Sequence, residues 1–468
     1  MRLLARLATL LALCLLTPAH AAPQPVVADV EVTRDGNSWI ADYHFSRAAP
    51  AWAFLHSALA REDRKPWRPR SWTIETKGLR LERHGWYDVL VSERGNVPER
   101  VRIRFTPSTL DLEADYDPAL VFSDGAVALF TDQFDVTPLP SAAAAAKLPI
   151  ELRNIDIAGL TRATFRDRAG KVLHAGVRKD KVVTTEGRSY VLFGKGEVVS
   201  TADIAAVLDP ALPKWLADDL RTSTPRLLAL HRQLLGPRSG PKPMLMASWA
   251  GPTPGRTSLG GSVLPGLVLM AFEGAGVAER SQQARDYMHW FVAHETAHFW
   301  LGQTVDYDAA NHAWMTEGGA DLIAVRAIPS IDPAYDPRKR LNEAIAKCAG
   351  YARRPVNSAN ERSEHDAYYA CGAVFGLVAE AAQNKRRPGG GIGGFWRSLI
   401  EANRKDGVVS QADWLAMLTQ VSRDPTLARD IRRLAERGSD EPRRDIASLF
   451  RRAGVAHDVA GSGELRLR

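Results

Sequence analysis

Beyond its first residues, the chain of 468 amino acids has no apolar run long enough to cross a membrane, so no integral membrane segment is expected. It has no long internal repeat, and its formal net charge of +7 is modest for its length. Without a recognisable motif, that basic excess does not predict nucleic-acid binding. Cysteine is scarce, with three residues in all. Cys14 lies in a leader-like segment, which leaves Cys348 and Cys371, and the sequence leaves open whether these two form a disulfide or stay free thiols.

The first residues are typical of a targeting segment. Met1–Ala21 contains two arginines, then a leucine-rich apolar run, then small residues before a cleavage position. This order predicts a secretory signal peptide. We therefore expect an exported protein, periplasmic or secreted after cleavage of the leader.

Hydrophobic periodicity divides the rest of the chain into a β-rich part and a helical part. Residues 22–201 contain short stretches of alternating apolar and polar residues, which predict an antiparallel β-sandwich or saddle. From residue 202 onwards the apolar residues recur at helical spacing. A chain of this length exceeds one ordinary core. The expected fold class is α+β, with domains at 22–201 and 202–386 and a small helical part at 387–468.

The strongest chemical signal is the pair His294 and His298, with Glu295 between them. If Ser281–Leu301 is one helix, the two histidines lie one turn apart on the same face and can share a metal ion, for which zinc is suitable. Glu295 follows round the helix, so its carboxylate can reach a water on that ion without being a ligand.

A third ligand is expected from a second helix. Eighteen residues separate His298 from Glu317, which is enough for a turn between two helices. Two histidines and one carboxylate leave a fourth position open, the pattern of a catalytic zinc site. Asp321, four residues later, would accept the free ring N–H of a liganding histidine. Gly318 and Gly319 are poor helix formers, so we expect the two motif helices to approach closely there.

These residues resemble a known group of enzymes. The segments His294–Val305 and Trp314–Gly318 are similar to those of gluzincin metallopeptidases of the aminopeptidase N and glycyl aminopeptidase type. The resemblance covers about residues 200–390. It implies a β-rich N-terminal domain, a thermolysin-like, mainly helical catalytic domain, and one zinc ion per chain. It also implies a peptide or protein substrate.

The resemblance also implies an oxyanion donor. In that group a tyrosine in a Tyr-x-Lys-Gly setting donates a hydrogen bond to the oxyanion, and the segment Tyr369–Gly372 matches it except that Cys371 replaces the lysine. Tyr368 is the neighbouring candidate. A bridge between Cys348 and Cys371 would restrain the segment that carries Tyr369.

The sequence departs from the family where the family binds the substrate. The aminopeptidases use a glutamate in a Gly-x-Met-Glu-Asn stretch to bind the free amino group, and Val263 stands at that position here. Gly260, Gly261, Ser262 and Val263 are the corresponding substrate-binding candidates. The resemblance further implies that the strand expected at 266–272 borders the cleft and pairs with the substrate backbone.

The function predicted from these patterns is zinc-dependent peptide hydrolysis, with Glu295 as general base and Tyr369 as oxyanion donor. Loss of the amine-binding glutamate leaves a second hypothesis open, a gluzincin-like binding protein that is inactive or hydrolyses an ester or epoxide. The residue preference of the enzyme, terminal or internal cleavage, and the oligomeric state are not given by the sequence.

Overall fold

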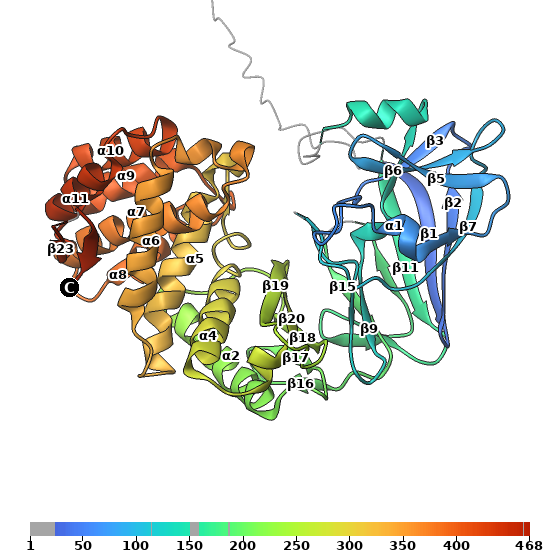
Figure 1. Cartoon of the computed structure of the whole chain (residues 1–468), viewed down its shortest axis with the longest axis horizontal. Coiled ribbons are helices and arrows are strands. Elements are labelled where there is room, and N and C mark those ends of the chain that lie inside the picture. Colours follow the sequence, from blue (N-terminus) through green and yellow to red (C-terminus); the bar gives the residue numbers. More distant parts are fainter. Residues whose placement is uncertain (1–23, 114, 150–158, 186–187, 462) are drawn as a thin grey trace, which may run out of the picture.

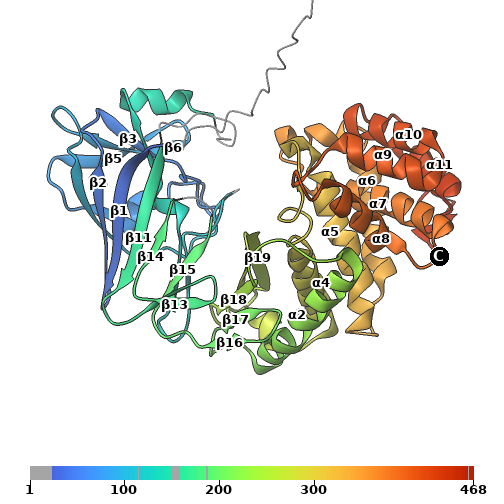
Figure 2. The same cartoon turned by 180° about the vertical axis from the view of Figure 1, so that it is seen from behind.

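The computed structural model describes residues 24–468 except 114, 150–158, 186–187 and 462. The expected leader Met1–Ala21 lies outside the described residues. Within the described part, no helix is both long and apolar enough to cross a membrane. A β-rich part and a bundle of helices stand at opposite ends of the molecule, and a smaller mixed sheet lies between them (Figures 1 and 2).

The described residues of the β-rich part form three sheets, whose strands follow in spatial order. The six-stranded sheet consists of β14 (Val182–Thr184), β11 (Leu160–Asp167), β1 (Val26–Asp35), β2 (Ser38–Phe45), β7 (Arg100–Phe105) and β4 (Trp72–Ile74). The four-stranded sheet consists of β10 (Val136–Leu139), β3 (Ala51–Phe54), β6 (Tyr87–Ser92) and β5 (Leu79–His84). The five-stranded sheet consists of β13 (Val177–Lys179), β12 (Val172–His174), β15 (Tyr190–Phe193), β9 (Val127–Phe130) and β8 (Ala119–Val121).

Pairing in this part is antiparallel except between β1 and β11, which run parallel. The alternation predicted from the sequence is visible in β7, where Val101, Ile103 and Phe105 are buried and the arginines between them are exposed. These side chains enter one hydrophobic cluster formed by all three sheets. Short helices α1 (Arg68–Ser71), η1 (Asp132–Phe134) and η2 (Ala142–Lys147) connect the strands.

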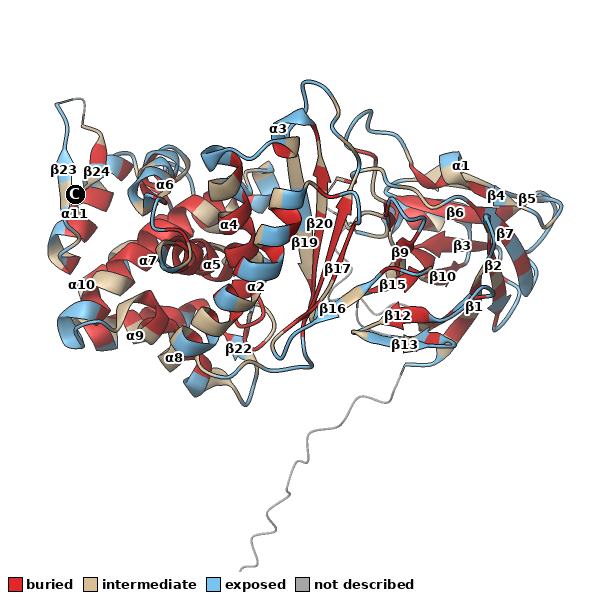
Figure 3. Cartoon of the chain, turned by 90° about the horizontal axis from the view of Figure 1, so that it is seen from below, coloured by how far each residue is buried: buried red, intermediate tan, exposed pale blue. Residues whose placement is uncertain are grey.

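The strands of the central mixed sheet are apolar on both faces because the sheet packs between the β-rich part and the helices. Its order is β16 (Val198–Ser200), β17 (Ala205–Leu208), β18 (Met244–Trp249), β20 (Leu267–Glu273) and β19 (Ser258–Leu264). Along β18, Met244 and Met246 pack against the β-rich part, whereas Leu245 and Ala247 pack against the helices. Figure 3 shows the inner strands of this sheet as buried. The sheet therefore joins the two ends of the molecule.

Helices form the remainder of the described chain. They are α2 (Lys214–Leu235), α3 (Ala275–Ala278), α4 (Gln282–Ala297), α5 (Trp314–Ala327), α6 (Pro337–Tyr351), α7 (Asp366–Arg386), α8 (Gly391–Asn403), α9 (Gln411–Ser422), α10 (Pro425–Glu436) and α11 (Pro442–Ala453). Single 3₁₀ turns lie at η3 (Ala310–His312), η4 (Ile328–Ser330), η5 (Val356–Ser358) and η6 (Asn360–Arg362). Two short pairs complete the set, β21 (Asp306–Tyr307) with β22 (Val408–Val409), and β23 (His457–Val459) with β24 (Leu465–Leu467).

The predicted fold class is confirmed: an N-terminal β-rich part is followed by a mainly helical part. One hydrophobic cluster extends from Ile204, just before β17, to Leu465 in the last strand. The helices after residue 387 therefore share a core with those that carry the metal-binding motif. The domain boundaries remain a prediction.

Candidate active site

Helix α4 presents both motif histidines. The hydroxyl of Ser281 accepts the backbone N–H of Ala284 and caps the helix at the residue where the sequence predicted its start. The regular helix ends at Ala297, so His298 occupies the C-cap position rather than the interior of a longer helix. Both histidine side chains are buried.

Helix α5 presents Glu317, and its two glycines lie at close contacts with different neighbours. A Cβ atom on Gly318 would lie 2.1 Å from the carbonyl carbon of Gly372 on α7. A Cβ atom on Gly319 would lie 2.7 Å from Leu301 and Trp396 side-chain atoms. Gly318 therefore permits a close approach of α5 to α7, which the sequence did not predict, whereas Gly319 meets Leu301 at the end of the motif helix expected at Ser281–Leu301. The crossing brings α7, which carries Tyr369, next to Glu317.

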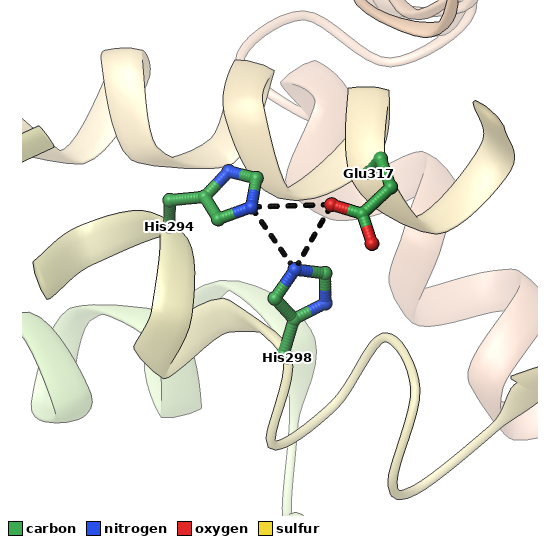
Figure 4. A group of neighbouring side chains, drawn as sticks. All are labelled: His294, His298 and Glu317. Carbon is green, nitrogen blue, oxygen red and sulfur yellow. Dashed lines mark hydrogen bonds and ion pairs between the residues drawn. The ribbon is translucent and has the colours of Figure 1, made fainter. Parts of the chain in front are cut away.

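Three ligand atoms converge between the two helices (Figure 4). The Nε2 atoms of His294 and His298 are 3.0 Å apart. Glu317 Oε2 lies 3.3 Å from the first and 3.4 Å from the second. Two zinc bonds of about 2.0–2.1 Å at a tetrahedral angle separate their ligand atoms by roughly 3.3 Å. The three separations match the edges of a zinc coordination tetrahedron.

Two further observations show that these residues fit a metal ion. Among the described residues, Glu317 Oε2 is a buried oxygen without a hydrogen-bond partner. The Nδ1 atom of His294 lies 3.0 Å from Asp321 Oδ1, and Nδ1 of His298 lies 2.8 Å from the carbonyl oxygen of Leu301. Both Nδ1 atoms must donate to these acceptors, so both Nε2 atoms present lone pairs to the same point. Asp321 thus lies where the sequence placed it, against a motif histidine.

The electrostatics of the site favour a positive charge at that point. Burial by itself lowers the pKa of His294, but the nearby Asp321 and Glu317 carboxylates outweigh burial and raise this pKa to about 10. Burial raises the pKa of Glu317, but the two histidines outweigh it and hold this pKa well below the usual carboxyl range. The carboxylates stabilise the positively charged form of His294, and the histidines stabilise the negatively charged form of Glu317. A divalent ion at the same point would gain the same stabilisation.

Glu295 differs from Glu317 in its surroundings. Its side chain is half-buried, and no ion pair or hydrogen bond of its carboxylate occurs among the described residues. Burial raises the pKa of Glu295, the two histidines lower it, and the Glu317 and Asp321 carboxylates raise it further. Glu295 is therefore a carboxylate beside the three candidate metal ligands, and its surroundings favour the protonated form.

The structure separates the two tyrosine candidates. The Tyr369 ring stacks on the His294 ring, with centroids 5.5 Å apart and an interplanar angle of 25°. The Glu317 carboxylate, followed by burial, raises the pKa of Tyr369 well above its usual value. The hydroxyl of Tyr368 instead hydrogen-bonds to the backbone of Asn357 and Asn360. Tyr369 thus faces the metal ligands, whereas Tyr368 holds the preceding loop.

The open question about the two cysteines has a structural answer. Cys348 on α6 and Cys371 on α7 form a disulfide, with Cα atoms 4.7 Å apart. The bridge lies two residues from Tyr369 and therefore restrains the segment that presents this side chain.

Two residues of the site were not found from the sequence. The indole N–H of Trp290 donates to Asp321 Oδ1 over 2.8 Å, so this oxygen accepts from Trp290 as well as from His294. The guanidinium of Arg340 on α6 lies 3.3 Å from the centre of the Trp290 ring and 3.8 Å from Asp321 Oδ1. Trp290 precedes His294 by one helical turn, a spacing that could have identified it. Arg340 has no comparable local signal.

The substrate-binding expectations need one correction. Strand β20, expected to pair with the substrate, is hydrogen-bonded to β18 on one side and β19 on the other, so it has no free edge. The edge strand next to α4 is β19, which contains the four candidates Gly260, Gly261, Ser262 and Val263. A Cβ atom on Gly261 would lie 2.7 Å from the ring of Phe291 on α4, so only glycine fits against the helix there.

The other histidines near the motif have partners elsewhere. Nε2 of His289 lies 3.0 Å from Asp219 on α2, and Nδ1 of His312 lies 2.7 Å from Asp308. Neither belongs to the group of three ligands.

No protein family model matches the chain, and no curated protein matches it by sequence. Solved structures match its fold. An aminopeptidase N family protein from Idiomarina loihiensis superposes with a TM-score of 0.58 at 10% identity, over 84% of this chain and 73% of that one. Native leukotriene A4 hydrolase from Saccharomyces cerevisiae superposes with a TM-score of 0.51 at 10% identity, over 89% of this chain and 68% of that one.

At such low identity the likeness shows the fold. The chain has a gluzincin aminopeptidase-like fold, that of the aminopeptidase N family protein to which it is similar. This confirms the resemblance found in the two motif segments.

Proposed function

We propose that the protein is an exported zinc-dependent metallopeptidase. The observation that carries this proposal is the convergence of two imidazole Nε2 atoms and a buried, otherwise unpaired carboxylate oxygen, with Glu295 beside them. A structural zinc site has four protein ligands and does not need an unliganded carboxylate next to an open position. The fold supports the proposal, and export rests on the leader segment alone.

His294, His298 and Glu317 would hold the ion. When bound, zinc would polarise a scissile carbonyl and lower the pKa of water at its open position to about 7. Glu295 accepts a proton from the attacking water and delivers it to the leaving amine. Tyr369 remains protonated because its pKa is raised. Its hydroxyl donates a hydrogen bond to the developing oxyanion, a type of contact whose removal costs about 3 kcal/mol.

Replacing Glu295 by Gln tests this division of roles. The variant should keep one zinc ion per chain but lose roughly a thousandfold in kcat, because it lacks the proton acceptor while all three ligands remain. Metal content and the cleavage of a mixed peptide library are the measurements. Glu279→Gln, at an exposed position just before α4, is the matched control and should behave as the wild type.

The outcomes test the role of Glu295 and the metal site separately. Retained zinc with retained activity in Glu295→Gln would exclude Glu295 as the base. A wild-type protein without zinc would exclude the metal site.

A second candidate function is hydrolysis of an ester or epoxide. It is favoured by Val263 at the position where aminopeptidases carry the amine-binding glutamate, and by the fold shared with leukotriene A4 hydrolase, whose name gives a non-peptide substrate. Zinc-loaded protein that cleaves no peptide but hydrolyses a member of an ester and epoxide panel would establish it. Zinc-loaded protein that does neither would point to a binding role.

A further inference from the structure

Strand β19 has an outer side that is free within the described part of the chain, because β20 is its only partner strand there. Leu264 pairs with Leu267 across a two-residue turn, which makes them the hydrogen-bonded closing pair of the hairpin. Alternation along an antiparallel strand then directs the backbone groups of Val263, Gly261 and Leu259 outwards. These are the positions where an extended peptide can add as a further strand.

One of these three positions is already occupied. The hydroxyl of Tyr116 donates a hydrogen bond to the carbonyl oxygen of Val263 over 3.2 Å. Tyr116 precedes Val263 by 147 residues and belongs to the β-rich part of the molecule. A peptide on β19 can therefore pair with Gly261 and Leu259, but it cannot pair with the Val263 carbonyl while this contact holds.

The segment around Tyr116 is held firmly in place. The backbone N–H of Tyr116 donates to the Asp115 carboxylate over 2.8 Å, and that carboxylate also bonds to His56. The hydroxyl of Tyr190 donates to the carbonyl oxygen of Asp117. Because these contacts fix both neighbours of Tyr116, its hydroxyl is positioned before any substrate arrives.

A cleft of about 1410 Å³ follows the strand away from this contact. Its lining includes Tyr116, then Gly260 to Ser262, and it continues to Ser258 and Glu273 at the far end of the strand pair. Gln303, five residues after His298, accepts from the backbone N–H of Gly266 and donates to the carbonyl oxygen of Leu264 in the hairpin turn. The blocked end of the edge strand therefore lies on the side of the candidate metal ligands, and the open cleft leads away along the strand.

We propose that Tyr116 is a specificity-determining residue that ends the substrate-pairing edge of β19, so that a bound peptide extends along the cleft in one direction from a chain end. This inference rests on the proposed peptidase function. Antiparallel pairing is the more stable kind per residue. A peptide bound in this way would run from Val263 towards Ser258 and would place its amino end at Tyr116.

The test uses one peptide sequence in three forms: with both ends free, with the amino end acetylated, and with the carboxyl end amidated. Cleavage positions and kcat/KM are measured for the wild-type protein, Tyr116→Phe and Tyr116→Ala. The wild type should cleave at a fixed distance from the amino end and should disfavour the acetylated form. Tyr116→Phe should reduce that preference about fivefold, the effect of one net hydrogen bond. Tyr116→Ala should reduce it further and permit internal cleavage.

Tyr190→Phe is the matched control, because it removes a hydroxyl that holds the same segment without touching β19. It should leave the end preference unchanged. A preference for a free carboxyl end that both Tyr116 variants relax would support the role of Tyr116 and show that the peptide binds in parallel. Equal cleavage of all three forms by the wild type, or an unchanged preference in both variants, would overturn the inference and leave the peptidase function standing. Zinc-loaded wild type that cleaves none of the peptides would overturn both.

Discussion

The carboxylate of Asp321 should determine how tightly the site holds zinc, although it is not itself a ligand. Its Oδ1 accepts the Nδ1–H of His294 over 3.0 Å and the indole N–H of Trp290 over 2.8 Å, and Arg340 lies 3.8 Å away. In Asp321→Asn the side chain keeps its shape but loses its charge, and its single amide oxygen must replace a carboxylate. The His294 ring is then less basic and less firmly oriented.

The expected loss follows from this geometry. Changing a partner that orients a metal-bound histidine typically costs about 10–100-fold in metal affinity, which corresponds to roughly 1.4–2.7 kcal/mol. The Trp290→Phe variant keeps the carboxylate and removes only one of its donors. Its effect on zinc affinity should therefore be smaller, about that of one hydrogen bond, or roughly fivefold.

The assay is competition for zinc between the protein and a chromophoric chelator, with thermal unfolding of the metal-free protein as a second measurement. Asp219→Asn is a matched control, because Asp219 accepts from His289, a buried histidine of the same helix that is not a ligand. It should lower stability and leave zinc affinity unchanged. Wild-type zinc affinity in Asp321→Asn would refute the reasoning, and so would an equal loss of zinc affinity in Asp321→Asn and Asp219→Asn.

Two further predictions concern stability. Replacing Cys348 and Cys371 together by Ala should lower the free energy of unfolding by about 3 kcal/mol, as expected for a bridge across a separation of 23 residues. It should also lower kcat through Tyr369, and both effects are measured against the oxidised wild type. Burial lowers the pKa of His231 to about 4, against a smaller opposing effect of its hydrogen bond to Ala293. Because the pKa of His231 is lower in the folded protein than in the unfolded chain, its stabilising contribution is complete above pH 6.5 and is lost as the pH falls towards 4. The contribution is at most about 3 kcal/mol. Urea unfolding of the metal-free protein between pH 7 and 4.5 should show this slope, which should be weaker in His231→Gln.

Much of the candidate site could be predicted because its parts are local in the sequence. Helical spacing places His294 and Glu295 in the last turn of α4 and His298 at its C-cap, and the same spacing relates Glu317 to Asp321 on α5. The change of period near residue 202 likewise precedes the first long helix, α2, although the strands β17 to β20 of the mixed sheet also follow it. Such patterns depend only on backbone geometry and on which side chains avoid water.

Other features depended on segments that are distant in the sequence. The glycines of α5 could be recognised as contact points, but only the folded chain shows that Gly318 meets α7 while Gly319 meets Leu301 and Trp396. The strand expected to bind substrate was misplaced. Periodicity identifies a strand, whereas its place at the edge or inside of a sheet depends on the order in which strands pair.

The sequence by itself determined the α+β fold class, and it predicted which groups would hold a metal ion and move a proton. Tertiary structure alone decided that Tyr369 rather than Tyr368 faces the ligands, that Trp290 and Arg340 surround Asp321, and that Tyr116 closes one end of β19. The physical reason is that hydrogen bonds and ring contacts act over a few ångströms. Residues far apart in the chain acquire them only when packing of the whole molecule brings their elements together.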